Sequence, residues 1–346
     1  MGKLTYSDAG VDREKRKEAK KFLNLLESTH IFSKYGDILK TPFNNLYPIN
    51  NNKYQVKTCD GIGTKVLLAQ LAGKHDTIGI DGIAMVVNDC IRCGAKPIAL
   101  TDVIDIKKSN PELLGEIEKG LRKGCFESKC PLVGGETADV PELMSTEYHI
   151  NCDCVGEVEK KNIITGRNII PDNLIIGLKS SGIHSNGISL ARRVLFKEWG
   201  GKFDAYEQPD NFDRELIYEV LEPTRIYVKS FLKLMSSVDV LGAVHITGDA
   251  YLKFKRLMKY SKKIGFEFNN FKPQPIFNLI KEAGNVEKKE MFKTFNMGWG
   301  FAVIVDKNQA DNTIDILEKQ KIESEVIGKI TNDSKVLVKN YSKIIL

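Results

Sequence analysis

Four short polar loops, each containing glycine, carry most of the side chains that could do chemistry in this chain. They span residues 60–65, 134–138, 180–187 and 245–249. Each loop follows an apolar run and precedes an apparent helix, so backbone N–H groups and a positive helix end would point to one place. Such a place suits a phosphate or another anion. Four such loops together predict an enzyme that binds more than one phosphorylated ligand.

The first loop offers an acidic residue at the end of a strand and a basic residue at the start of a helix. Asp60 in that position could bind Mg²⁺, which prefers carboxylate and phosphate oxygens. Lys65 could neutralise nucleotide phosphates. The loop resembles a Walker A motif only superficially, because no Ser or Thr follows Lys65 and the glycine spacing differs. The competing interpretation is a plain strand-to-helix turn.

Three polar residues interrupt the apolar stretch that follows. Asp81 and Asn88 share one face of a helix, and Asp89 lies about 100° further round. Because this helix is apolar on every side, we expect it to be buried, and buried polar groups need partners. Metal ligation by these residues is one solution, and a cap or a hydrogen-bonded network is the other. Asp102, on the next apolar run, is a further candidate.

The second and third loops have their own candidates. Glu136 directly follows a glycine pair, where it could bind a second Mg²⁺ or a ribose hydroxyl. A bare turn with a solvated carboxylate is the alternative. In the loop 180–187, Ser and Asn side chains and the following helix end could hold a phosphate, with His184 facing the reacting group. Otherwise His184 is an ordinary surface residue of a loop.

Length and composition limit the classes of function. The 346 residues fit two domains, and 42% hydrophobic with 28% charged residues is typical of a soluble globular protein. The net charge of +6 is scattered over Lys-rich helix surfaces, which argues against nucleic-acid binding. No apolar stretch is long enough to cross a bilayer and no signal-peptide pattern begins the chain, so we expect no membrane partner and a cytoplasmic location. The seven cysteines are expected to be buried free thiols.

The elements that must position these side chains follow from hydrophobic periodicity. We expect strands at 54–59, 77–80, 97–106, 149–158 and 174–178, and helices at 64–71, 83–93, 111–125, 188–199, 227–235 and 251–259. The segment 36–52 is expected to be a loop, and the glycines at 134–135 a turn. The pattern breaks near 166–172, so we predict an N-terminal domain at 1–168 and a C-terminal domain at 169–346. Strands and helices do not alternate strictly, which favours an α+β fold.

Taken in order, these motifs resemble those of the aminoimidazole ribonucleotide synthetase family, also called phosphoribosylformylglycinamidine cyclo-ligases. The residues that carry the resemblance are 8–12, 60–65, 75–81, 88–89, 132–138, 180–187, 223–229, 283–287 and 294–298. Some of these motifs recur in the wider superfamily. Their order and spacing together are specific, and they cover most of the chain.

The resemblance implies an ATP-dependent ring closure in purine biosynthesis. ATP would phosphorylate the formyl-amide oxygen of formylglycinamidine ribonucleotide, and intramolecular attack would then give aminoimidazole ribonucleotide, ADP and phosphate. ATP is therefore the expected co-substrate and Mg²⁺ the expected cofactor. The family also implies a homodimer in which mixed, helix-bearing N-terminal sheets pair across the dimer, and a separate C-terminal α+β sandwich.

The resemblance further implies roles for individual residues. The implied catalytic residues are Asp60, Lys65 and His184. The implied metal ligands are Asp60, Asp81, Asp89 and Glu136. Nucleotide binding is implied for Gly61, Gly63, Thr64, Lys65, Asn88, Gly134, Gly135, Glu136 and Thr137. Substrate binding is implied for Ser181, Ser185, Asn186, Gly187, Thr247 and Gly248. Which loops contact ATP and which contact the substrate stays open, as does the chemical role of His184.

Two features depart from the family pattern. After Thr247 the family has three glycines, whereas this chain has Gly248, Asp249 and Ala250, which puts an anion in a loop expected to face phosphate. The glycine-rich segment expected before the first core strand is also missing, because 35–52 contains only Gly36.

Other members of the superfamily are the nearest alternatives. The formylglycinamide ribonucleotide amidotransferase is longer and duplicated, and selenophosphate synthetase would need a reactive Cys in a glycine-rich N-terminal segment. Thiamine-monophosphate kinase should lack the block at 285–298. A non-catalytic, nucleotide-binding maturation scaffold is a different class, and the absence of cysteine from the C-terminal residues disfavours it.

Overall fold

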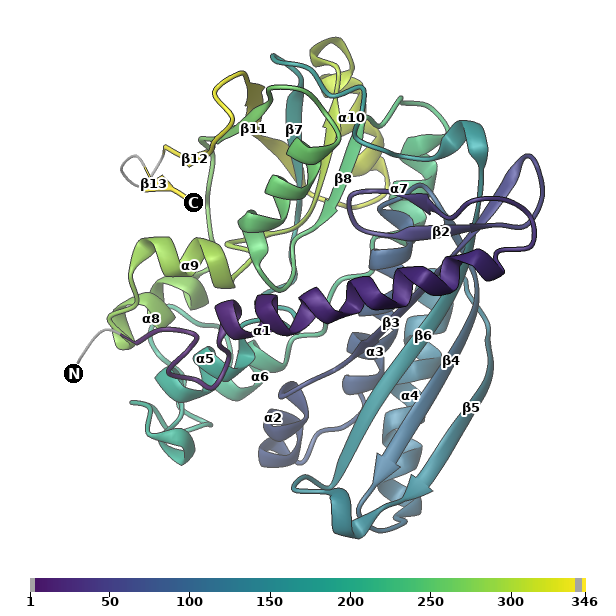
Figure 1. The fold of residues 1–346 in the computed structure, drawn as a ribbon. Helices are drawn as coiled ribbons and strands as arrows, with labels where there is room; N and C mark the ends of the chain where they lie inside the picture. Colours follow the sequence, from purple (N-terminus) through teal and green to yellow (C-terminus); the bar gives the residue numbers. More distant parts are fainter. Residues whose placement is uncertain (1–3, 340–343) are drawn as a thin grey trace.

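The computed structural model describes residues 4–339 and 344–346, which form two halves, each built on its own mixed β-sheet (Figure 1). Within these residues, the N-terminal half has a six-stranded sheet in the order β1-β2-β3-β6-β4-β5. The C-terminal half has a seven-stranded sheet in the order β13-β12-β9-β11-β7-β10-β8. Helices pack against both sheets, so the predicted two-domain α+β fold is confirmed.

The N-terminal sheet has helices on one face. Its strands are β1 (Leu39–Lys40), β2 (Asn45–Pro48), β3 (Lys53–Gly61), β4 (Lys96–Ile106), β5 (Leu132–Asp139) and β6 (Tyr148–Glu159). Its helices are α2 (Lys65–Ala72), α3 (Ile78–Ile91) and α4 (Pro111–Ser128). Helix α3 packs on β3, β6 and α4 and is buried almost throughout. Buried and half-exposed residues alternate along β6, as expected for a strand with one face on a core.

In the C-terminal sheet, β10 is buried along its whole length. Its strands are β7 (Leu174–Lys179), β8 (Gly242–His245), β9 (Gly265–Phe268), β10 (Trp299–Val305), β11 (Ser324–Thr331), β12 (Val336–Val338) and β13 (Ile344–Ile345). The α-helices are α5 (Ile188–Leu195), α6 (Leu216–Leu221), α7 (Val228–Met235), α8 (Pro275–Ala283), α9 (Lys288–Thr294) and α10 (Ala310–Lys319). The 3₁₀ segment η5 (Ala250–Lys259) follows β8. A cluster of aromatic rings around Tyr251 packs η5 against β9.

Three local predictions were wrong. The segment 77–80 begins helix α3 and is not a strand, because Gly79 lets α3 approach α4 closely; a Cβ there would lie 2.2 Å from the backbone nitrogen of Leu121. The glycines at 134–135 lie inside strand β5 and do not form a turn. The segment 36–52 contains β1 and β2, which extend the sheet beside β3.

An N-terminal helical arm joins the two halves. It consists of α1 (Arg13–Ala19) and the 3₁₀ segment η1 (Lys20–Phe32), which Figure 1 draws across the front of the molecule. Arg13 donates hydrogen bonds to Glu290, to the carbonyl oxygen of Lys293 and to Thr294, so the arm is fixed to the C-terminal half.

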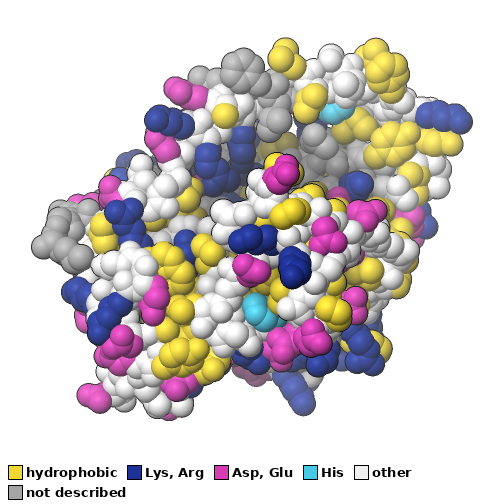
Figure 2. Space-filling model, turned by 90° about the horizontal axis from the view of Figure 1, so that it is seen from below, with side chains coloured by type: hydrophobic (Ala, Val, Ile, Leu, Met, Phe, Trp, Pro, Cys, Tyr) yellow, Lys and Arg dark blue, Asp and Glu magenta, His cyan; other side chains and the backbone are white. Residues whose placement is uncertain are grey.

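The surface carries charges of both signs. On the face in Figure 2, Lys and Arg side chains alternate with Asp and Glu side chains, in keeping with the scattered charge of the sequence. Large apolar side chains are exposed on η1, among them Leu25, Ile31 and Phe32. Among the described residues, no helix is long and apolar enough to cross a membrane.

Candidate active site

A buried ion pair lies where the two halves meet. Lys65, the first residue of α2, places its Nζ 3.0 Å and 2.9 Å from the two carboxylate oxygens of Asp81 in the first turn of α3. Both side chains are 0% exposed. Lys65 also donates to the carbonyl oxygen of Glu222 at 2.7 Å. Oδ1 of Asp81, which lies 3.0 Å from Lys65, also accepts three other hydrogen bonds. They come from the N–H and hydroxyl of Thr224 at 2.8 and 2.6 Å and from the hydroxyl of Ser185 at 2.9 Å. These two predicted site residues therefore bind each other and two segments of the C-terminal half.

Two further predicted site residues, His184 and Asn88, form hydrogen bonds with the same segments of the C-terminal half. His184 is buried and has a positive φ of 66°, and its Nε2 accepts the backbone N–H of Ser181 at 3.2 Å. Burial, with the nearby His245 and Lys65, lowers the pKa of His184 well below its usual range, so the ring is neutral at pH 7. Asn88 accepts the N–H of Tyr227 at 2.9 Å and donates to the carbonyl oxygen of Arg225.

A second cluster of charges lies at the other end of α3. Asp89 accepts hydrogen bonds from Arg92 Nη1 and from His245 Nδ1, both at 2.8 Å. Burial opposes the charge on Asp89, but Arg92, the His245 bond and Lys253 outweigh it and hold the pKa of Asp89 below its usual range. Burial lowers the pKa of His245 to about 4 despite the contact with Asp89. His245 is therefore neutral at pH 7, with its proton on Nδ1 and a bare, buried Nε2.

Asp60 faces this second cluster from the end of β3. Burial raises its pKa, and the negative charge of Asp89 raises it further. Two neighbouring carboxylates, one of them short of positive partners, suit a divalent cation that also takes phosphate and water oxygens. The pair fits Mg²⁺ in donor type, although no group of three or more acidic, His or Cys side chains within the described part of the chain has the geometry of a complete metal site.

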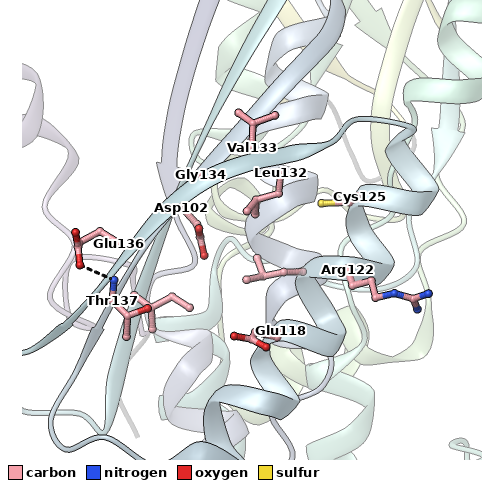
Figure 3. Close-up of a pocket in the computed structure, with 12 residues that line it drawn as sticks. Asp102, Glu118, Arg122, Cys125, Leu132, Val133, Gly134, Glu136 and Thr137 are labelled. Carbon is pink, nitrogen blue, oxygen red and sulfur yellow. Dashed lines mark hydrogen bonds between the residues drawn. The ribbon is translucent and has the colours of Figure 1, made fainter.

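The glycine strand β5 lines a separate pocket of about 770 Å³ between β4, β5 and α4 (Figure 3). Gly134, Gly135 and Thr137 line it, and Asp102 lies directly under Gly135, where a Cβ would be 2.1 Å from the Asp102 carboxylate. Burial raises the pKa of Asp102. Glu136 points away from the α4 side chains in Figure 3, and its Oε1 accepts the N–H of Thr137 at 3.0 Å.

Within one chain, Glu136 lies far from Asp60. The residues Asp60, Cys152, Asp102 and Gly135 are successive partners across four neighbouring strands. At about 4.8 Å per strand, β5 lies roughly 14 Å from Asp60. The predicted residues thus form three groups. One surrounds Lys65 and Asp81, one joins Asp60 to Asp89, and one lies on β5.

In the loop after β8, two residues that are not glycine adopt the backbone conformation that favours glycine. Asp249 and Ala250 have positive φ values of 66° and 37°. The Asp249 carboxylate lies 3.6 Å from Nε of Arg13 in the N-terminal arm, and Thr247 accepts a hydrogen bond from Lys253. The side-chain amide of Asn186 faces Gly248. A Cβ added at Gly248 would lie 3.0 Å from the Asn186 side-chain oxygen. The predicted substrate loops therefore lie against each other.

Sequence reasoning gave no role to His245, Arg92, Lys253 or Thr224. The position of His245 at the end of a strand, directly before a Thr-Gly pair, was the available signal. The other three became visible only through contacts that span large sequence distances.

The family described as AIR synthase related protein matches in two parts, the N-terminal domain at residues 44–158 and the C-terminal domain at 171–339. A phosphoribosylformylglycinamidine cyclo-ligase from Pyrococcus furiosus is 44% identical over 344 residues, with 98% of each chain covered. The one from Carboxydothermus hydrogenoformans is 40% identical and covers 98% of this chain and 100% of the relative.

Solved structures share the fold at low identity. A thiamine-monophosphate kinase from Stenotrophomonas maltophilia has a TM-score of 0.65 at 15% identity and covers 89% of this chain and 92% of its own. PurL from T. maritima complexed with ADP has a TM-score of 0.60 at 14% identity and covers 91% of this chain and 46% of its own. At such identities the likeness concerns the fold alone.

Proposed function

The chain belongs to the phosphoribosylformylglycinamidine cyclo-ligases of the AIR synthase related family, and we propose how its residues carry out that ATP-dependent reaction of purine biosynthesis. The observation that carries the activity is identity of 40–44% over 98% of the chain. The substrate is formylglycinamidine ribonucleotide. We further propose a cytoplasmic enzyme whose two domains meet near residue 168, between the two family matches.

The chemistry has two steps. The terminal phosphoryl group of ATP passes to the formyl oxygen, which turns a poor leaving group into a good one. The ribose-bearing nitrogen of the amidine then attacks the formyl carbon, and phosphate leaves as the ring closes. Holding nucleophile and carbon in contact lowers the barrier of the second step. Positioned charges lower that of the first.

We assign the phosphoryl-transfer end of the site to Asp60, Asp89 and the loop at 61–64. Asp60 and Asp89 would hold Mg²⁺, which supplies positive charge to the transferred phosphoryl group. The raised pKa of Asp60 supports this assignment. A divalent cation would offset both the cost of burying the Asp60 charge and the repulsion between Asp60 and Asp89. The backbone N–H groups of Gly63 and Thr64, directly before α2, suit the phosphate oxygens.

We assign the loops at 181–187 and 247–248 to the ribonucleotide. The contacts of Asp81 with Thr224 and Ser185 hold the first of these loops against α3. His184 stabilises the same loop by accepting the backbone N–H of Ser181. Its buried, neutral ring favours a positioning role over proton donation.

We propose a homodimer in which N-terminal sheets pair and β5 of one copy completes the nucleotide site of the other. Strand β5 is an exposed edge, and its residues from Leu132 to Thr137 are all exposed. An exposed edge of this kind is normally covered or paired. Glu136 lies roughly 14 Å from Asp60 in its own chain, too far for both carboxylates to hold one Mg²⁺, so a metal ion shared by these two residues requires a second copy.

The test is product formation by the purified chain. Aminoimidazole ribonucleotide should form from formylglycinamidine ribonucleotide only when ATP and Mg²⁺ are both present, with one ADP for each ring. A non-hydrolysable ATP analogue in place of ATP serves as the negative control. Product formed without ATP would refute the proposal.

A further inference from the structure

A strongly basic pocket lies between the N-terminal arm and the C-terminal half. Its volume is about 500 Å³, within the usual range for small-molecule sites. Its walls come from α1, η5 and α9, and α1 and α9 are neighbours in Figure 1. Nine basic side chains and two acidic side chains line it. Such an excess of one sign in a concave surface concentrates anions.

In the part of the chain that the structure describes, most of these positive charges have no ion pair. Within the described residues, Arg13 is the only basic side chain of the pocket with an ion pair, to Glu290 at 2.6 Å and to Asp249 at 3.6 Å. The others include Arg16 and Lys17 on α1 and Lys289 on α9. Because like charges repel, an anionic ligand would stabilise this arrangement.

The floor of the pocket reaches the proposed site. Lys253 is buried and donates to the carbonyl oxygen of His245 at 3.1 Å and to the hydroxyl of Thr247. Burial lowers the pKa of Lys253 to about 8, so the group still carries charge at pH 7. An anion in the pocket would therefore lie beside the loop at 247–248.

We infer that this pocket binds the 5′-phosphate of the ribonucleotide substrate, with α1 as one wall. The inference rests on the proposed function and assigns one phosphorylated ligand to one place. A phosphate monoester without a bound metal ion is stabilised by cationic side chains, which the pocket supplies. The triphosphate of ATP suits the Asp60 and Asp89 end, where carboxylates would repel a phosphate that lacks Mg²⁺.

The unusual Asp249 gains a role in this arrangement. Together with Glu290 it holds the guanidinium of Arg13 from two sides and so fixes α1 over the pocket. The Asp249 carboxylate then pairs with Arg13 of the N-terminal arm, and the other basic side chains of the pocket stay available for the ligand. An anionic residue in this loop is therefore compatible with phosphate binding next to it.

The test is a double variant, Arg16→Gln with Lys289→Gln, which removes one exposed charge from each of two walls. Hydrogen bonds to charged groups predict that kcat/KM for formylglycinamidine ribonucleotide falls roughly ten- to a hundredfold, while KM for ATP stays within about twofold. The matched control is Arg167→Gln with Lys319→Gln, which removes the same charges from exposed positions outside the pocket. The control should change neither constant by more than about twofold.

Calorimetry with ribose 5-phosphate separates this inference from the activity. The wild-type chain should bind the probe, and the pocket variant should bind it at least about tenfold more weakly than the control variant. A larger KM for ATP in place of the ribonucleotide effect would overturn the inference, as would equal probe binding by both variants. If no ring closure is detected in the wild type, the proposed function fails, and the calorimetry still decides whether the pocket holds a sugar phosphate.

Discussion

Replacing Lys65 with methionine removes the only ammonium group that contacts Asp81 in the described structure. Its Nζ lies 2.9 and 3.0 Å from the two oxygens of a carboxylate that is 0% exposed. Removing one partner of a buried ion pair leaves the other charge uncompensated, which costs about 3–5 kcal/mol of unfolding free energy. At roughly 2–4 °C per kcal/mol for chains of this size, Tm should fall by roughly 6–20 °C.

Thermal and urea unfolding of the purified variant measure this loss. The matched control is Lys74→Met, which removes a half-exposed lysine 2.7 Å from Asp76 and should cost less than about 1 kcal/mol. Adding Asp81→Leu to Lys65→Met should recover part of the stability, because no buried charge then remains unpaired. A Lys65→Met variant as stable as the wild type, with a much higher KM for ATP, would refute the structural role. Lys65 would then act on the nucleotide.

Three further predictions concern the proposed site. Asp60→Asn should raise the Mg²⁺ concentration needed for half-maximal activity at least about tenfold without lowering Tm, because it removes a carboxylate that burial disfavours; an equal loss of stability would contradict this. Asp60→Asn and Glu136→Gln chains, unfolded and refolded together and assayed at an Mg²⁺ concentration at which each variant alone has little activity, should regain up to about a quarter of wild-type activity if each dimer site draws on both copies; no recovery despite mixed dimers would contradict shared sites. The unfolding free energy should fall as pH decreases from about 6.5 to about 4, because the unfolded chain protonates His184 and His245 there and the folded chain keeps both neutral. His245→Asn should reduce this slope in pH-dependent urea unfolding, and an unchanged slope would assign it to His184 and other groups.

Local sequence signals predicted the elements that local chemistry determines. Helix α4, expected at 111–125, begins where Pro111 occupies the first turn, and in the structure Asn110 caps it by accepting the N–H of Leu113. The error at 77–80 has a different origin. That segment is rich in β-branched residues, but close packing of α3 against α4 through Gly79 favours the helix.

The site was harder to predict because its contacts span the whole chain. The sequence indicated that Asp81 is buried and needs a partner, but the partner is Lys65, from the loop that was expected to hold phosphate. His184 was expected to face a reacting group, and in the structure it is buried and accepts the N–H of Ser181 in its own loop. The contact of His245 with Asp89 joins residues 156 positions apart, which no local pattern encodes. The assignment of these residues to metal, nucleotide or substrate stays a prediction.

The fate of the formyl oxygen tests the account most directly. Formylglycinamidine ribonucleotide labelled with ¹⁸O at the formyl position should deliver its label to inorganic phosphate during a single turnover with ATP and Mg²⁺, as read by mass spectrometry. Label released into water, with unlabelled phosphate, would mean that the oxygen is never phosphorylated and would contradict the proposed mechanism.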